Sequence, residues 1–503
     1  MPLPRRGGIL LHPTSLPGPF GSGDLGAGAY HFVDWLVAGR QSLWQVLPLG
    51  DIGLGNSPYM SPSAFAGNIL LVDLRQLHEA GWLQDEDLEP DPAFEVCRVD
   101  YPSVIRFRIE RLRRAAKRFF TGAPRDLRMA YDAFCADSRS WLDDYALFRA
   151  LDTAFGGIAW QEWPAPLARY DGQALQDAAR QYAGESDFWK FCQWCFSEQW
   201  AGLKSYANDR GIEIIGDVPI FVALHSADVW SHPDLFDLDA AGYPYFVSGV
   251  PPDPFSAEGQ RWGNPLYRWP AHASQNYHWW VERMQAATRL YDLVRIDHFR
   301  GFESFWEIPA DAETAVEGCW QPGPRTALFE ELRRRLGELR FIAEDLGIIT
   351  AEVNSLRKGA GLPGMRILQF AFDFNPENPY LPHNFERDTV VYTGTHDNDT
   401  TRGWWNSLAE REKDYVRRYL GINGDSVSRD MIRAAWASVA AFAIAPMQDV
   451  LGLDSANRMN RPGQGQGSWE WRFSWSQVES WHAGFLDELT RLYARSSRKI
   501  AAA

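Results

Sequence analysis

The feature that most restricts the fold of this 503-residue chain is a series of short strand-like runs that alternate with helical segments. Each run is apolar over several consecutive residues, a pattern typical of parallel strands that are covered on both faces. Eight such runs separated by helices predict an α/β protein built as a (β/α)8 TIM barrel. The predicted strands span residues 7–12, 43–50, 212–222, 291–299, 339–347, 364–372, 388–397 and 441–450.

Amphipathic patterns predict helices between these strands. Residues 27–39 and 325–337 have this pattern, and a glycine ends the second helix. Residues 474–497 predict a long closing helix with one apolar face. No clear β-sandwich follows the eighth unit, so we expect one catalytic barrel over residues 1–503, with no C-terminal β-sandwich domain.

Two connections are too long for simple barrel loops. Residues 75–205 are rich in helical patterns and predict a largely helical insertion. Within it, residues 105–119 predict a helix with Ile105 on its apolar face. Its basic residues, Arg108 among them, are expected on a solvated face rather than in a polyanion site. Residues 225–276 are rich in Pro, Gly, Asp and aromatic residues, and we expect a loop-rich insertion over the active-site cleft.

Composition argues against several classes of function. The net charge of −15 argues against a nucleic-acid or anionic membrane partner, because phosphate groups are bound by clustered Lys and Arg. Five cysteines do not make a disulfide framework. No targeting segment is visible, and the longest apolar stretch is shorter than the ~20 residues that span a bilayer. We expect a cytoplasmic protein, and the sequence does not indicate its oligomeric state.

Aromatic residues are unusually frequent, with 23 Trp, 18 Tyr and 29 Phe making up 14% of the chain. Such residues fill hydrophobic cores, and their flat faces also suit the C–H faces of sugar rings. Composition alone favours the core role, so the count permits a carbohydrate ligand without requiring one.

Acidic residues follow the ends of four predicted strands. In a barrel the active site lies at the C-terminal ends of the strands, so these side chains should converge at one mouth. Acidic groups are costly to bury without partners. Acidic side chains that converge from four strand ends therefore indicate a functional site rather than a structural role. The acids are Asp217, Asp297, Glu344 with the adjacent Asp345, and Asp397.

Two kinds of chemistry use such a cluster. Metal-assisted hydrolysis uses several carboxylates, often with His, and His298 and His396 lie beside two of the acids. Glycoside chemistry needs an ionised nucleophile and a protonated acid. Arg295 shares a strand face with Asp297 and would keep it ionised, while Glu344 among negative charges should have a raised pKa. This difference, with the aromatic excess, favours sugar chemistry.

The acids lie in distinctive segments, VRIDHFRGF around Asp297, IAEDLG around Glu344 and TGTHDNDT around Asp397. Together with five further segments they span nearly the whole chain. The combination resembles the amylomaltases, the 4-α-glucanotransferases of glycoside hydrolase family 77. The further segments are RGGILLHPTSLPGPFGSGDLG, NSPYMSPSAFAGN, GDVPIFVALHSADVW, GVPPDPFSAEGQRWGNPLY and NRMNRPGQ.

The resemblance implies an enzyme that transfers a segment of an α-1,4-glucan to the 4-hydroxyl of an acceptor glucan or glucose. The reaction would be a retaining double displacement that needs no metal or organic cofactor. The expected partners are maltooligosaccharides, starch or glycogen chains, and glucose. Asp297 would be the nucleophile, Glu344 the general acid/base and Asp397 the transition-state stabiliser. The expected substrate-binding residues are Ser57, Tyr59, Asp217, Asp253, Phe255, Trp262, Arg295, His298, Asp345 and His396.

Alternatives remain for the supporting residues and for the activity. Tyr59 and Trp262 could be core aromatics, His298 could only support its neighbours, and Ser57 could only shape a turn. Pro254 stands where many relatives have Tyr, which puts the shape of the cleft loop in doubt. An α-1,4-glucan hydrolase would use the same acids, and a glucan-binding barrel without catalysis is the alternative from another class.

Overall fold

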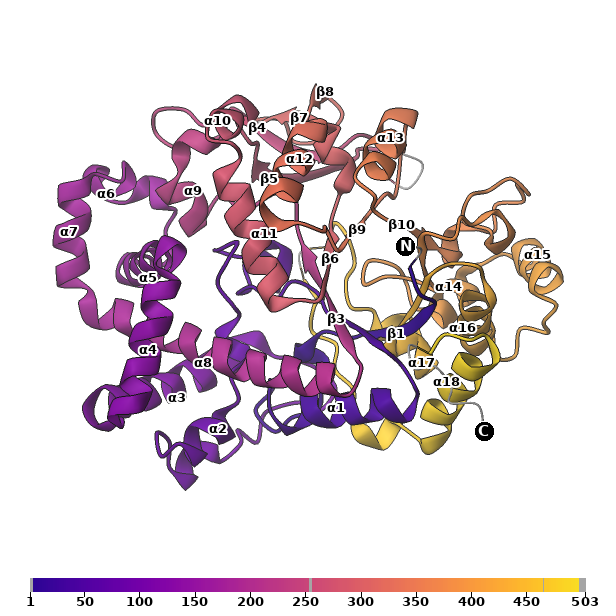
Figure 1. Ribbon diagram of the computed structural model, residues 1–503, viewed down its shortest axis with the longest axis horizontal. Helices are drawn as coiled ribbons and strands as arrows, with labels where there is room; N and C mark the ends of the chain where they lie inside the picture. The colour runs from indigo at the N-terminus through magenta and orange to yellow at the C-terminus, as the bar shows by residue number, and fades with distance from the viewer. Residues whose placement is uncertain (1–2, 253–255, 465, 497–503) are drawn as a thin grey trace.

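The computed structural model describes residues 3–252, 256–464 and 466–496 (Figure 1). Eight parallel strands close into a barrel in the order β1-β12-β11-β10-β9-β6-β3-β2, which confirms the predicted TIM barrel. They are the eight strands predicted from the sequence, and each is shorter than predicted. The strands are β1 (Arg6–Leu10), β2 (Leu43–Gln45), β3 (Glu213–Val218), β6 (Leu293–Ile296), β9 (Phe341–Ala343), β10 (Gly364–Ile367), β11 (Thr389–Tyr392) and β12 (Phe442–Pro446).

The first strand closes the barrel by pairing with the last. Strand β1 pairs with β12 over its whole length and with β2 on its other side. Gly8 is required at this junction, because a Cβ there would lie 2.5 Å from the Cβ of Leu43. Gly8 therefore allows β1 to approach β2 closely.

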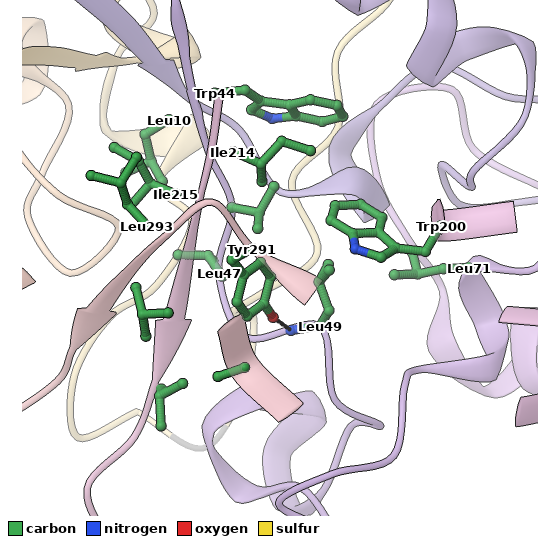
Figure 2. Close-up of a cluster of buried hydrophobic side chains, with 14 of the residues drawn as sticks. Leu10, Trp44, Leu47, Leu49, Leu71, Trp200, Ile214, Ile215, Tyr291 and Leu293 are labelled. Carbon is green, nitrogen blue, oxygen red and sulfur yellow. Dashed lines mark hydrogen bonds between the residues drawn. The ribbon is translucent and has the colours of Figure 1, made fainter. Parts of the chain in front are cut away.

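The barrel and its surrounding helices share one hydrophobic core, part of which is shown in Figure 2. Two of the buried tryptophans in it pair their indole N–H groups with backbone carbonyls. The indole N–H of Trp44 donates to the carbonyl of Leu11 at 2.8 Å, and that of Trp200 donates to the carbonyl of Leu290 at 2.9 Å. Much of the aromatic excess thus fills the core, where a paired N–H removes the cost of burying an indole.

The connection from β2 to β3 is mainly helical and lies beside the barrel, in the indigo to magenta part of Figure 1. Its longest helix, α8, packs against α3, α4 and α5. The helices are α2 (Leu74–Glu79), α3 (Tyr101–Gly122), α4 (Arg125–Asp137), α5 (Arg139–Ala154), α6 (Ala165–Ala168), α7 (Gly172–Gln181) and α8 (Ala183–Asp209).

The prediction for the basic face of α3 was wrong at Arg108, which is fully buried. Its guanidinium pairs with Asp24 at 3.0 Å and donates to the carbonyls of Val72 and Ser22 at 2.9 and 3.3 Å. Ile105, predicted on the apolar face, is instead 39% exposed. The buried face of α3 thus differs from the predicted one. Helical periodicity could not show this difference, because the acid and carbonyls that compensate the buried charge of Arg108 come from other segments.

The connections that flank β6 contain an antiparallel sheet that the sequence did not indicate. Its order is β5-β4-β7-β8, and it lies at the top of Figure 1. The strands are short and interrupted by Pro and Gly, so they have no clear alternating pattern. The elements are α9 (Ala227–Ser231), β4 (Phe246–Val250), β5 (Gln260–Pro265), α10 (Trp269–Ser274), α11 (His278–Leu290), β7 (Ser304–Pro309) and β8 (Cys319–Pro322).

The predicted helices α1 (Ala27–Ala38) and α12 (Arg325–Leu336) are confirmed, whereas the closing helix α18 (Ser480–Leu492) is shorter than predicted. Ser474 begins a separate 3-10 turn before it. No strand follows β12 in residues 447–464 and 466–496, and no helix of the described chain is long and apolar enough to cross a membrane. The remaining helices are α13 (Ala351–Gly359), α14 (Thr401–Ser407), α15 (Glu410–Leu420), α16 (Val427–Ala437) and α17 (Met447–Val450).

Replacing Arg108 with alanine should lower the free energy of unfolding by about 3–5 kcal/mol, because Asp24 would stay buried without its cation. The control is Arg106→Ala, an exposed position on the same helix, which should change that free energy by less than about 0.5 kcal/mol. Urea unfolding followed by Trp fluorescence measures both changes. Equal effects of the two substitutions would contradict the structural role of the buried ion pair.

Candidate active site

The four predicted acids lie just at or after the ends of four barrel strands. Asp217 is the last residue but one of β3, and Asp297, Glu344 and Asp397 follow β6, β9 and β11. Strand β6 lies between β3 and β9, and its residue Ile296 pairs in register with Ala343 of β9. Asp297 and Glu344 are the next residues on these neighbouring strands, so the register itself brings the two carboxyl groups together.

Arg295 joins two of the acids within the barrel. Its Nη1 lies 2.8 and 2.6 Å from the two carboxylate oxygens of Asp217, and its Nη2 lies 2.9 Å from Oδ1 of Asp297. The guanidinium and Asp217 are buried, whereas the Asp297 side chain remains 28% exposed. A guanidinium at this distance favours the charged form of a carboxylate, and Asp297 is the member of the group that a ligand can reach.

Glu344 is buried beside Asp297 and has a different environment. Its oxygens accept hydrogen bonds from the backbone N–H groups of His298 at 2.6 Å and Leu346 at 2.9 Å, which favour the charged carboxylate. Burial and the nearby charge of Asp297 outweigh these bonds and raise the pKa of Glu344 to about 8. The raised pKa expected from the sequence is present, and burial is its main cause. At neutral pH this group therefore carries a proton that it can donate.

Asp397 is held by polar groups from two segments. Its Oδ1 accepts a hydrogen bond from Nδ2 of Asn460 at 2.6 Å, and its Oδ2 lies 3.2 Å from Nε2 of His396. The Asp397 side chain is 46% exposed, and loss of part of its hydration acts to raise its pKa. The interactions with His396 and Asn460 outweigh this effect and lower the pKa to about 2. Asp397 is thus charged at neutral pH. Asn460 was not predicted as a site residue, although its segment NRMNRPGQ had signalled the family.

Aromatic rings form a wall beside these acids. The Tyr59 ring stacks on the His396 ring with centroids 5.1 Å apart, and Trp469 lies 5.7 Å from Tyr59. The Tyr59 hydroxyl donates to Asp217 at 2.9 Å, which ties the wall to the acids. Trp469 was not predicted, because it follows a glycine-rich stretch without a pattern. The hydroxyl of Ser57 accepts from the Tyr59 N–H at 3.2 Å, which fits its turn-shaping alternative.

His298, which directly follows Asp297, contacts Trp262 of β5 in the small antiparallel sheet. Their rings meet edge to face with centroids 4.8 Å apart. His298 is buried in a left-handed backbone conformation with φ 50°, and its Nε2 has no hydrogen-bond partner among the described residues. Burial, with a smaller contribution from Arg300, lowers the pKa of His298 to about 3, so the ring is neutral at neutral pH.

The structure does not bring every predicted residue into the cluster. The carboxylate of Asp345 is buried, pairs with Arg357 and Arg366 at 3.2 and 3.3 Å, and accepts the N–H of Met365 at 2.6 Å. These partners place it apart from the four converging acids. Asp253, Pro254 and Phe255 lie outside the described residues. No group of three or more His, Cys, Asp or Glu side chains in the described chain is arranged to hold a metal ion.

Comparisons with known proteins agree on one family. A family model described as 4-alpha-glucanotransferase matches residues 11–477. The chain is 49% identical to the 4-alpha-glucanotransferase of Thermus thermophilus over 97% of this chain and 98% of that protein. It is 45% identical to the Synechocystis enzyme of the same name over 98% of each chain. The chain belongs to the 4-α-glucanotransferases of glycoside hydrolase family 77.

A solved structure shows that this 4-α-glucanotransferase also shares the fold of its family. The amylomaltase from Streptococcus agalactiae, solved in complex with acarbose, superposes with a TM-score of 0.95 at 39% identity. The match covers 98% of this chain and all of the other. The resemblance noted from the sequence, the barrel and the enzyme class are thereby confirmed, and the transferase is favoured over the hydrolase and the non-catalytic barrel.

For this 4-α-glucanotransferase, kcat/KM should fall above a pH of about 8. Glu344 with its raised pKa carries the donated proton below this pH, and it loses the proton above it. The measurement is kcat/KM for a maltooligosaccharide from acidic to alkaline pH. The control is Tyr59→Phe, which keeps the ring and should leave the alkaline limb in place. A decline centred near a pH of about 4–5, where an unperturbed glutamate titrates, would contradict the assignment.

Proposed function

We propose that this enzyme transfers α-1,4-glucan segments by a retaining double displacement. Asp297 is the nucleophile, Glu344 the general acid/base and Asp397 the stabiliser of the transition state. The observation that carries the proposal is the contrast between two neighbouring carboxyl groups. Asp297 pairs with Arg295, whereas Glu344 is buried with a pKa raised to about 8. Retaining glycosidases need one charged and one protonated carboxyl group in this arrangement.

In the first step, a carboxylate oxygen of Asp297 attacks the anomeric carbon of the donor glucan. The bond between this carbon and the bridging oxygen breaks, and Glu344 gives its proton to that oxygen. The leaving glucan departs with a free 4-hydroxyl, and a glucosyl ester of Asp297 remains. The positive charge that develops on the sugar ring is stabilised by the Asp397 carboxylate, whose low pKa keeps it charged.

In the second step, the 4-hydroxyl of an acceptor glucan or glucose attacks the same anomeric carbon. Glu344, now a carboxylate, takes the hydroxyl proton while the ester bond to Asp297 breaks. Two displacements at one carbon restore its original configuration. Water in the place of the acceptor would give hydrolysis, so exclusion of water from the mouth decides the ratio of transfer to hydrolysis.

The groups around the acids support a glucose ring as the ligand. Tyr59, only partly buried, offers an apolar ring for sugar C–H groups. Asp297 and Asp397, whose side chains are 28% and 46% exposed, offer carboxylate oxygens for hydroxyl groups. The acarbose bound by the S. agalactiae amylomaltase supports the same class of ligand. We infer that the donors are maltooligosaccharides or starch and glycogen chains. The cytoplasmic location stays a prediction from the sequence.

We further propose that the two long insertions have separate roles. Residues 75–205 form a largely helical insertion beside the barrel, and residues 225–276 form the insertion over the cleft. The contact between Trp262 and His298 supports the second role, because His298 directly follows Asp297 and its backbone N–H binds Glu344.

Incubation with maltotriose tests the proposed function. The wild-type enzyme should release glucose and produce a ladder of longer maltooligosaccharides, because each cleaved segment is passed to another chain. Asp297→Asn should lower turnover by about 10³-fold or more while the protein stays folded. The matched control is Asp311→Asn, the same substitution at an exposed position, which should keep full activity.

Two outcomes would contradict this proposal. Products that only become shorter would identify a hydrolase. Near-normal turnover by folded Asp297→Asn would exclude Asp297 as the nucleophile.

A further inference from the structure

An exposed tryptophan lies on the small antiparallel sheet, away from the hydrophobic core. Trp320 of β8 is 38% exposed. It pairs in register with Trp306 of β7, and the two rings meet at a centroid distance of 5.1 Å and an angle of 67°. Trp306 donates its indole N–H to the carbonyl of Ala315, but the Trp320 ring is left partly open to solvent.

One buried arginine connects this ring to the loops that carry Asp297 and Glu344. The guanidinium of Arg300 lies over the Trp320 ring, 3.7 Å from its centroid. Arg300 follows Asp297 by three residues in the chain. Its Nη1 donates to the carbonyl of Ile348, which follows Glu344 by four residues and is 53% exposed. Trp320 and Ile348 therefore flank one arginine beside the active-site mouth.

Arg300 also holds the Trp320 ring in one orientation. Arg300 is held in place by the Ile348 carbonyl and by the hydroxyl of Ser304, which accepts from Nη2 at 3.2 Å. A cation over an aromatic face stabilises the stack, and here it covers one face of the indole. Any ligand that stacks on Trp320 would do so without first ordering the ring, which lowers the cost of binding.

We propose that Trp320, with Ile348 beside it, forms a glucan subsite for the part of an acceptor chain that extends beyond Glu344. This inference rests on the proposed function, in which Glu344 faces the leaving and entering glucan. Sugar C–H faces and an open indole face are complementary surfaces. The patch continues from the loops of Asp297 and Glu344, so an α-1,4-glucan that enters the mouth is the occupant that can reach it.

A structural role of the Arg300–Trp320 stack makes a different prediction. If the ring only supported the loop after Glu344, its loss would impair every acceptor to the same extent. A distal subsite instead affects long acceptors more than glucose, because glucose cannot reach beyond the reacting position. Dependence on acceptor length therefore separates the two roles.

The test compares Trp320→Ala and Trp320→Phe with the wild type, using maltoheptaose and glucose as acceptors with one donor. Trp320→Ala should raise the ratio of KM for maltoheptaose to KM for glucose by about 3- to 10-fold, the worth of one aromatic contact. Trp320→Phe should restore most of the wild-type ratio. The matched control is Trp481→Ala, because Trp481 is 42% exposed on α18 and stacks on His482. This control should leave the ratio unchanged.

A binding measurement separates this inference from the proposed function. In native gels that contain amylopectin, Asp297→Asn should migrate more slowly than in plain gels, and the added Trp320→Ala substitution should remove much of this retardation. An unchanged KM ratio with unchanged retardation would overturn the subsite, as would an equal loss of activity for both acceptors. Failure of the wild type to elongate maltotriose would instead overturn the proposed function. The two failures can be told apart, because retardation in the gel measures glucan binding and does not depend on turnover.

Discussion

The buried guanidinium of Arg295 is the interaction on which the arrangement of the site depends. It contacts Asp217 and Asp297 at once, and Asp217 in turn accepts the hydroxyl of Tyr59. A charge removed from water is tolerated only with partners, so loss of Arg295 would leave both Asp217 and Asp297 without their cation. The proposed nucleophile and the aromatic wall are therefore parts of one ion-pair and hydrogen-bond network.

The barrel register then places two neighbouring carboxyl groups in different environments. Asp297 has a cation beside it and is partly exposed, whereas Glu344 is buried and accepts hydrogen bonds from the backbone N–H groups of His298 and Leu346. Burial, helped by the charge of Asp297, raises the pKa of Glu344, so the position of the proposed nucleophile contributes to the environment of the acid. The surroundings of the two carboxyl groups, rather than their residue types, thus give one the role of acid and the other the role of nucleophile.

Much of this was accessible from the sequence because the fold and site follow from local patterns. Apolar runs predict the barrel strands, and the rule that active sites lie at their C-terminal ends selects Asp217, Asp297, Glu344 and Asp397. The predictions that failed concern residues whose partners lie far away in the sequence. Arg108 is buried by pairing with Asp24, and Asp345 lies among cations from α13 and β10 rather than at the mouth.

Other features had no local signal of their own. The small sheet is built from short strands without alternation, and its pairing joins segments on both sides of β6. Asn460 and Trp469 reach the cluster through a long, irregular connection after β12, where neither helical nor strand periodicity marks a position as functional. Tertiary contacts alone make these residues part of the site.

The central claim is that Asp297 forms a covalent bond to the sugar while Glu344 moves the proton, and trapping of the glucosyl-enzyme tests it most directly. The Glu344→Gln variant would be mixed with an α-glucosyl fluoride, whose fluoride leaves without protonation. Peptide mass spectrometry should then find one glucosyl group, attached to the peptide fragment at Asp297. A sugar attached at another residue, or turnover with inverted configuration and no attached sugar, would contradict the mechanism.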